Sequence, residues 1–163
     1  LYTGFLLDQP SAVRYPRGSG PGVAVEKEMT ALPLGKGEVR LQGEKIALLS
    51  FGSTLKLALQ AGEELGATVA NMRFVKPLDG DLVAELAASH DLLVTVEENV
   101  VQGGAGSAVN EYLVSRGITQ RILNYGLPDR LLQHGSQQDM LEDARLTREG
   151  LLEFINKVSP SAT

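Results

Sequence analysis

The central part of the chain alternates short apolar runs with longer amphipathic stretches. Ile46 to Leu49 and Leu92 to Val96 are almost uninterrupted apolar runs, a pattern typical of strands that are covered on both faces. Between them, apolar residues recur from Leu55 to Leu65 at the spacing of one helix face, and Ser53 stands where it would cap that helix. The pattern therefore predicts a strand, a helix and a second strand.

The same alternation continues to the C-terminus. We expect further strands at 67–72 and 121–124, and helices over 82–87 (introduced by Asp79 or Asp81), over 108–113 (entered from Gly103 to Gly106), near 137–141, and over 151–158 (capped by Thr147). Strands joined through helices make right-handed crossovers. The order of elements therefore predicts an α/β fold with three layers, a mostly parallel sheet and helices on both faces.

One further strand is expected ahead of this series. Glu38 to Leu41 and Lys45 to Ser50 flank the short segment Gln42-Gly43-Glu44, a spacing that indicates a hairpin. The first of these strands would then join the sheet as an antiparallel edge.

The N-terminal part of the chain differs in composition from the rest. Residues 1–17 include Ala12 to Tyr15, which has the character of a strand ended by Pro16, whereas residues 18–37 are rich in Gly and Pro, as in a linker. We therefore expect residues 1–17 to end a preceding domain and residues 38–163 to form the principal one. Because residue 1 is Leu and not Met, we also expect the chain to be a piece of a longer protein.

Composition narrows the range of functions. The chain has 163 residues, 43% hydrophobic and 21% charged, with a net charge of −5 that gives no general attraction to nucleic acid or to anionic membranes. It has no Cys and two His, so that neither a thiolate nor a zinc site is expected. No apolar run reaches the roughly 18 residues that a membrane span requires.

A glycine-rich loop follows the strand that ends in Val94-Thr95-Val96-Glu97-Glu98-Asn99. Gly103 and Gly104 lead into a helix N-terminus, where free N–H groups could cradle a phosphate. The spacing matches neither the dinucleotide fingerprint nor a P-loop, and the two carboxylates just ahead would repel phosphate. Close backbone packing, at a subunit contact for example, is therefore the favoured interpretation.

Glu97 and Glu98 are neighbours at the end of that strand. Successive side chains on a strand point to opposite faces, so that only one of them could enter a given cleft. Ligands collect at the carboxyl ends of strands in open α/β sheets. A functional or interface role for one of these carboxylates and a solvated edge therefore remain as alternatives.

Arg14 and Arg17 lie near the end of the N-terminal segment. In an extended chain their side chains face opposite ways, so at most one of them is a direct ligand of an anion. A surface arginine paired with a carboxylate is the alternative.

Several exact strings together carry a resemblance. They are Pro10-Ser11-Ala12-Val13-Arg14-Tyr15-Pro16-Arg17-Gly18, Leu34-Gly35-Lys36-Gly37, Met72-Arg73-Phe74-Val75-Lys76-Pro77-Leu78-Asp79, Val94-Thr95-Val96-Glu97-Glu98-Asn99, Gly103-Gly104-Ala105-Gly106-Ser107 and Gly126-Leu127-Pro128-Asp129. In this order they closely resemble the C-terminal end of the 1-deoxy-D-xylulose-5-phosphate synthases, thiamine-diphosphate enzymes of the transketolase family.

The resemblance implies a division of labour. In this family the upstream domains hold thiamine diphosphate and Mg²⁺ and supply the catalytic groups, so that no catalytic and no metal-binding residue is expected in this chain. Residues 1–17 would be the end of the pyrimidine-binding domain, and the C-terminal domain would serve packing and homodimer formation. The whole enzyme would join pyruvate and glyceraldehyde 3-phosphate, with loss of CO₂, in the cytoplasm or in a plant plastid.

One site residue follows from the resemblance. Arg17 matches, in the Arg-Tyr-Pro-Arg string, the family arginine that binds the phosphate of the aldehyde substrate. Arg14 has no such match. Two other interpretations remain open: a transketolase-type subunit of a 2-oxo acid dehydrogenase, and a non-catalytic assembly module with the same fold.

Overall fold

A five-stranded sheet forms the centre of the computed structural model, which describes residues 1–16, 20, 22, 24 and 27–158. The strand order is β1-β3-β2-β4-β5, and every neighbouring pair is parallel except β1 with β3. The strands are β1 (Glu38–Leu41), β2 (Ile46–Phe51), β3 (Thr68–Asn71), β4 (Leu92–Val100) and β5 (Ile122–Leu127).

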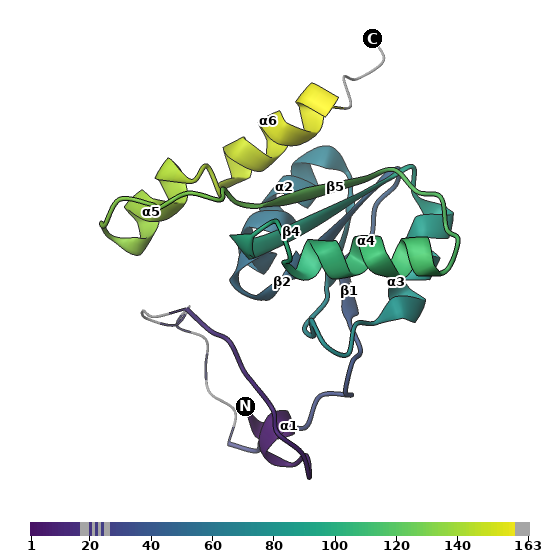
Figure 1. Ribbon diagram of the computed structural model, residues 1–163, viewed down its shortest axis with the longest axis vertical. Helices are drawn as coiled ribbons and strands as arrows, with labels where there is room; N and C mark the ends of the chain where they lie inside the picture. The colour runs from purple at the N-terminus through teal and green to yellow at the C-terminus, as the bar shows by residue number, and fades with distance from the viewer. Residues whose placement is uncertain (17–19, 21, 23, 25–26, 159–163) are drawn as a thin grey trace.

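Helices cover both faces of this sheet (Figure 1). On one face lie α2 (Leu55–Leu65) and α6 (Arg148–Val158), and on the other lie α3 (Gly80–Ser89) and α4 (Ala105–Ser115). The remaining elements are α1 (Tyr2–Phe5), the 3₁₀ helix η1 (Gly52–Thr54) and α5 (Gln137–Asp143). The predicted three-layer α/β fold is confirmed.

The apolar runs that predicted the central strands are buried on both sides. Along β2, Leu48 packs into the core beneath α2 and α6, whereas Ala47 and Leu49 pack into the core beneath α3 and α4. All three are fully buried. This alternation explains why β2 is apolar throughout instead of at every second position.

The predicted hairpin between β1 and β2 is wrong. β1 pairs with β3, which lies between β1 and β2 in the sheet. The connection crosses the end of β3, where the Gly43 N–H donates to Thr68 Oγ1 at 3.0 Å and the Glu44 N–H donates to the Gly66 carbonyl at 2.9 Å. Because β4 occupies the other side of β2, β1 joins at the outer edge of β3, where it is antiparallel as predicted.

Two of the three predicted helix caps are confirmed. Asp79 accepts from the Leu82 N–H at the start of α3, and Thr147 accepts from the Gly150 N–H at the start of α6. Ser53 does not cap α2: η1 precedes the helix, Thr54 takes the N-cap position, and the Ser53 hydroxyl donates to Glu98 instead.

The strand expected at Ala12 to Tyr15 is absent from the described residues. This segment is irregular, and the only regular element before it is the four-residue helix α1. A strand needs a partner for its N–H and C=O groups, and none of the described strands pairs with this segment. In Figure 1 the N-terminal segment lies outside the helix and sheet layers.

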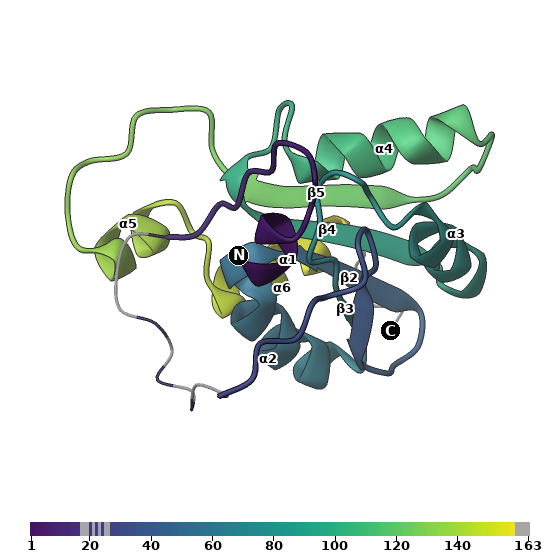
Figure 2. The same cartoon turned by 90° about the horizontal axis from the view of Figure 1, so that it is seen from below.

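The chain between β5 and α6 projects from the body as an arm that carries α5 (Figure 2). Ser136 and Asp139 form a reciprocal capping box at the start of α5. Arg130 bonds to Asp143 across the arm, with 2.8 Å between Nη2 and Oδ2. Within the described ranges, no helix is both long enough and apolar enough to cross a membrane.

Candidate functional site

The carboxyl end of β4 places a buried carboxylate against the N-terminus of α4. Glu97 is 3% exposed, and its two oxygens accept from the Ala105 N–H at 2.7 Å and from the Gly106 N–H at 2.8 Å. These N–H groups have no partner within the helix, and the helix dipole favours a negative charge there. Glu97 thus occupies the position that a bound phosphate would take.

The glycines of the loop make this arrangement possible. A Cβ atom at Gly104 would collide with the Glu97 carboxylate and with the Val100 carbonyl. Gly103 has φ of 72°, in the left-handed region that favours glycine. The predicted close packing is therefore observed at Gly104, whereas a Cβ atom at Gly103 would meet no atom within 4 Å and only the backbone conformation favours glycine there. A role for these two glycines in a subunit contact stays a prediction.

Glu98 faces a different environment from its neighbour. It is partly exposed, and its carboxylate accepts a hydrogen bond from the Ser53 hydroxyl. The two glutamates thus take separate partners, as their successive positions on one strand predict. They do not form a pair that could share a proton.

A shallow hollow of about 370 Å³ lies beside this loop. It is lined by the end of β5 with Val101, Gln102, Ala144 and Phe154. Tyr125 forms part of its wall, and burial raises the pKa of the phenol to about 12. The neutral hydroxyl donates to the Arg145 carbonyl, which ties the base of the arm to β5.

Asp79 forms a second ordered site, which sequence reasoning identified only as a helix cap. Its carboxylate also accepts from the Gly37 N–H at 2.8 Å and from Lys36 Nζ at 3.2 Å. Burial works to raise the pKa of Asp79, but the N–H groups of Gly37 and Leu82 and the Lys36 ammonium outweigh it and hold the pKa below its usual value. These bonds fix the end of the linker to the start of α3, across 42 positions of sequence that give no local signal.

The hydrogen bonds of His90 do not involve Glu97, Glu98 or Asp79. His90 is the C-cap of α3, and its ring nitrogens lie 3.1 Å from the Leu86 carbonyl and 2.8 Å from Thr68 Oγ1. His134 is exposed in the arm. Among the described residues, no three His, Cys, Asp or Glu side chains come together as a candidate metal site.

Of the two N-terminal arginines, the structure describes Arg14 but not Arg17. Arg17 lies outside the described residues, so its predicted contact with a phosphate stays a prediction. Arg14 is exposed in the N-terminal segment.

Chemically, the carboxylates of this region act as anchors for other parts of the chain. Glu97 and Asp79 each hold backbone N–H groups, and Glu98 is held by Ser53. A diphosphate group would not fit at the N-terminus of α4, because the Glu97 carboxylate already fills it.

The chain matches a known family over most of its length. Residues 35–151 match the family described as "Transketolase, C-terminal domain".

Curated relatives share a single name. The chain is 62% identical over 155 residues to the 1-deoxy-D-xylulose-5-phosphate synthase of Nitrosococcus oceani, covering 95% of this chain and 24% of the relative. It is 61% identical over 160 residues to the enzyme of the same name from Nitrosospira multiformis, covering 98% of this chain and 26% of the relative. The chain thus spans about a quarter of the length of these relatives.

Solved structures agree on the fold. A split-gene transketolase, described as an inactive beta4 tetramer, superimposes with a TM-score of 0.72 at 28% identity, covering 88% of this chain and 46% of that chain. A transketolase from Pichia stipitis gives a TM-score of 0.52 at 17% identity, covering 76% of this chain and 18% of that chain, which is a likeness of fold alone. The resemblance predicted from the sequence motifs is confirmed, and the chain belongs to the transketolase C-terminal domain family.

Proposed function

We propose that this chain is the C-terminal part of a 1-deoxy-D-xylulose-5-phosphate synthase, which joins pyruvate and glyceraldehyde 3-phosphate with loss of CO₂. The observation that carries this proposal is the identity of about 60% over almost the whole chain with synthases of that name. By contrast, the Pichia stipitis transketolase, which shares the fold, is only 17% identical.

Within the longer protein, residues 1–17 would end the pyrimidine-binding domain, residues 18–37 would form the linker, and residues 38–163 would form the C-terminal domain. Two observations support this division. The family match begins at residue 35, and the linker is tied to the domain at Lys36 and Gly37 through Asp79.

Thiamine diphosphate and Mg²⁺ would be held by residues outside this chain. When bound, thiamine diphosphate supplies the carbanion chemistry of such enzymes. Support comes from the Glu97 carboxylate, which fills the N-terminus of α4 after the glycine-rich loop. The chain alone would not catalyse, and we note that its 28% identical neighbour is described as an inactive tetramer.

The chain's own contributions would be packing, homodimer formation and one ligand to substrate. Arg17 would bind the phosphate of glyceraldehyde 3-phosphate, in which a guanidinium can make two parallel hydrogen bonds to phosphate oxygens. Glu97, Gly103 and Gly104 would shape a loop that meets another domain or subunit, and Glu98 would lie at that contact. The whole enzyme would work in the cytoplasm.

A hybrid enzyme tests the proposal. The C-terminal quarter of the Nitrosococcus oceani synthase is replaced by this chain, and formation of 1-deoxyxylulose 5-phosphate from pyruvate and glyceraldehyde 3-phosphate is measured. We expect activity within about tenfold of the parent, because the two segments are 62% identical. A control hybrid with the matching segment of the Pichia stipitis transketolase should be inactive.

The same experiment separates the alternatives. A stable, folded hybrid without synthase activity would contradict the proposal. Activity restored only on addition of lipoyl-domain acceptors would instead favour a 2-oxo acid dehydrogenase subunit, and a stable hybrid without any activity would favour an assembly module.

A further inference from the structure

The proposed function assigns no role to the cation Arg14. It lies three positions before Arg17, and within the described part of the chain its guanidinium forms neither a hydrogen bond nor an ion pair. If this segment is extended in the longer protein, as its sequence predicts, the two arginines face opposite ways, and Arg17 on a substrate phosphate would direct Arg14 toward another part of the protein.

One oxygen of the Glu98 carboxylate is available to bind a cation. The buried Glu97 fixes the end of β4 by bonding to the start of α4, and this holds the next residue at the surface of the domain. Ser53 donates to one oxygen of the Glu98 carboxylate and leaves the other without a partner in the described structure. An anion held in this way loses little side-chain entropy when it binds a cation.

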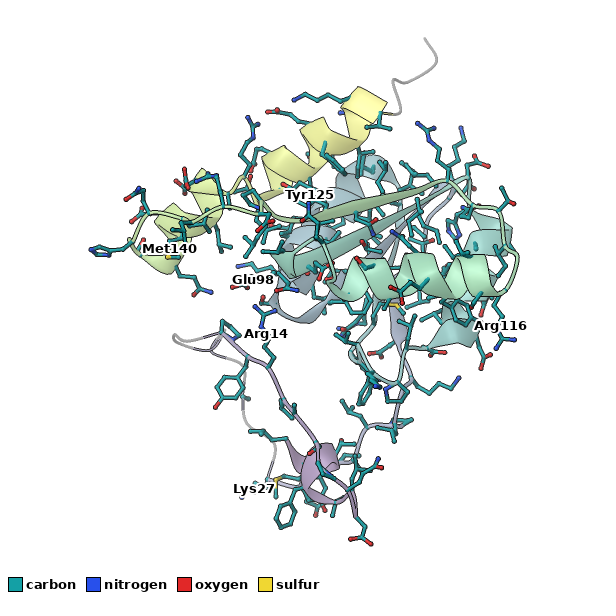
Figure 3. All side chains as sticks on the ribbon, in the orientation of Figure 1. Arg14, Lys27, Glu98, Arg116, Tyr125 and Met140 are labelled. Atoms are coloured by element: carbon teal, nitrogen blue, oxygen red, sulfur yellow. The ribbon has the colours of Figure 1, made fainter. Side chains whose placement is uncertain are left out.

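The side chain of Arg14 points toward the side of the domain that carries Glu98. In Figure 3 the side chain of Arg14 extends from the N-terminal segment toward the edge of the sheet at which Glu98 lies. Their charges are opposite, and guanidinium with carboxylate is the pair that forms two parallel hydrogen bonds.

We propose that Arg14 and Glu98 form an ion pair that orients the end of the preceding domain against the carboxyl edge of the C-terminal sheet. The pair would form when residues 1–17 take their place in the longer protein. This inference rests on the proposed function, and it assigns Arg14 the task of positioning the segment that carries Arg17. Arg14 would not touch substrate.

Charge reversal in the hybrid synthase tests the pair. Arg14→Glu and Glu98→Arg should each raise the KM for glyceraldehyde 3-phosphate by about two- to fivefold, the factor that corresponds to an ion pair worth up to about 1 kcal/mol. The KM for pyruvate should change less. The double variant Arg14→Glu with Glu98→Arg should return the KM for glyceraldehyde 3-phosphate to within twofold of the unmodified hybrid.

A matched control uses another exposed cation, which follows the Ser53 that bonds to Glu98. Lys56 is exposed and follows Ser53 by one helical turn. Lys56→Glu combined with Glu98→Arg should give no rescue. If this combination restores the KM, or if the Arg14 and Glu98 double variant does no better than the two single variants, the pair does not exist.

Cross-linking gives a readout that is independent of activity. The chain contains no Cys, so that Arg14→Cys with Glu98→Cys introduces the only two thiols of this chain. A short bis-maleimide should join them in the hybrid, detected by mass spectrometry of the linked peptides. Arg14→Cys with Glu111→Cys, an exposed position on α4, should give no linked peptide. An inactive hybrid that still shows the 14–98 link overturns the proposed function alone, whereas an active hybrid without the link overturns the pair.

Discussion

At the scale of single residues, two buried carboxylates organise the domain. Glu97 satisfies two N–H groups of α4, and Asp79 satisfies N–H groups of α3 and of the linker. Each places an anion at a helix N-terminus, where the helix dipole and the free donors stabilise it. In both cases a buried side chain fixes the backbone conformation around it.

Replacement of Glu97 should destabilise the domain strongly. In Glu97→Gln one acceptor oxygen becomes an NH₂ group that faces a helix N–H, and we expect a loss of about 2 kcal/mol in the free energy of unfolding. Urea denaturation of the 163-residue chain measures this. Glu98→Gln is the matched control, because Glu98 is partly exposed, and should change the stability by less than about 0.5 kcal/mol. Equal losses from the two variants would contradict the role given to Glu97.

Asp79 should make stability depend on pH in the acid range. Its pKa is lower in the folded chain than the ordinary value of 3.8, so the ionised carboxylate stabilises the fold above that pH, and this contribution is lost as the pH falls through the folded pKa. Asp79→Asn should therefore lose most stability near pH 7, and the difference from the unmodified chain should shrink as the pH falls below 3.8. Denaturation midpoints at several pH values measure the difference.

A neighbouring aspartate provides the control for this variant. Asp81 is 91% exposed and bonds to the same Lys36 ammonium at 2.9 Å. Asp81→Asn should alter stability little at any pH, because an exposed ion pair contributes little. A difference for Asp79→Asn that stays constant with pH would show that the carboxylate charge is not what matters.

At the scale of elements, local patterns predicted the structure well and distant pairings did not. The apolar runs of β2 and β4 and the helix face of α2 are properties of neighbouring residues, and they were found in the right places. The pairing of β1 depends on β3, about thirty positions away, whereas the short segment around Gly43 favours a hairpin. Turn spacing alone does not distinguish these two connections.

At the candidate site, too, the contacts between residues that are distant in sequence could not be predicted. The sequence shows the glycine loop and predicts that the carboxylates ahead of it repel phosphate. The structure shows that Glu97 itself takes the place of the anion, a contact that depends on how β4 and α4 meet. The bond between Gly37 and Asp79 was missed because 42 positions separate them.

The projecting arm offers a test at this scale. Tyr125 on β5 donates to the Arg145 carbonyl at the base of the arm, so Tyr125→Phe should lower the free energy of unfolding by about 1 kcal/mol, the usual net value of one hydrogen bond. Hydrogen exchange should speed up in the residues that follow α5. Tyr112→Phe is the control, because the Tyr112 hydroxyl makes no hydrogen bond within the described structure. Equal effects from both variants would indicate lost packing and not the bond to the arm.

At the scale of the whole molecule, the proposal places the cofactor chemistry in the upstream domains. Two apolar clusters fill the faces of the sheet, and the two buried carboxylates among the described residues, Glu97 and Asp79, accept hydrogen bonds from the chain's own backbone. Thiamine diphosphate with Mg²⁺ titrated into the isolated chain should therefore give no saturable heat in calorimetry. The hybrid synthase under the same conditions is the positive control, and saturable binding to the isolated chain would contradict the proposed division of labour.

Arg17 is the one residue of the chain to which the proposal gives contact with substrate. A hydrogen bond from a charged group is worth about 1.5–3 kcal/mol, so Arg17→Ala in the hybrid synthase should raise the KM for glyceraldehyde 3-phosphate by about ten- to a hundredfold. The KM for pyruvate, which carries no phosphate, should stay within about twofold and serves as the internal control. Arg17→Lys should recover part of the loss, because an ammonium keeps the charge but not the two parallel hydrogen bonds. Equal increases in both KM values would show that Arg17 supports the structure of the active site and does not contact the phosphate.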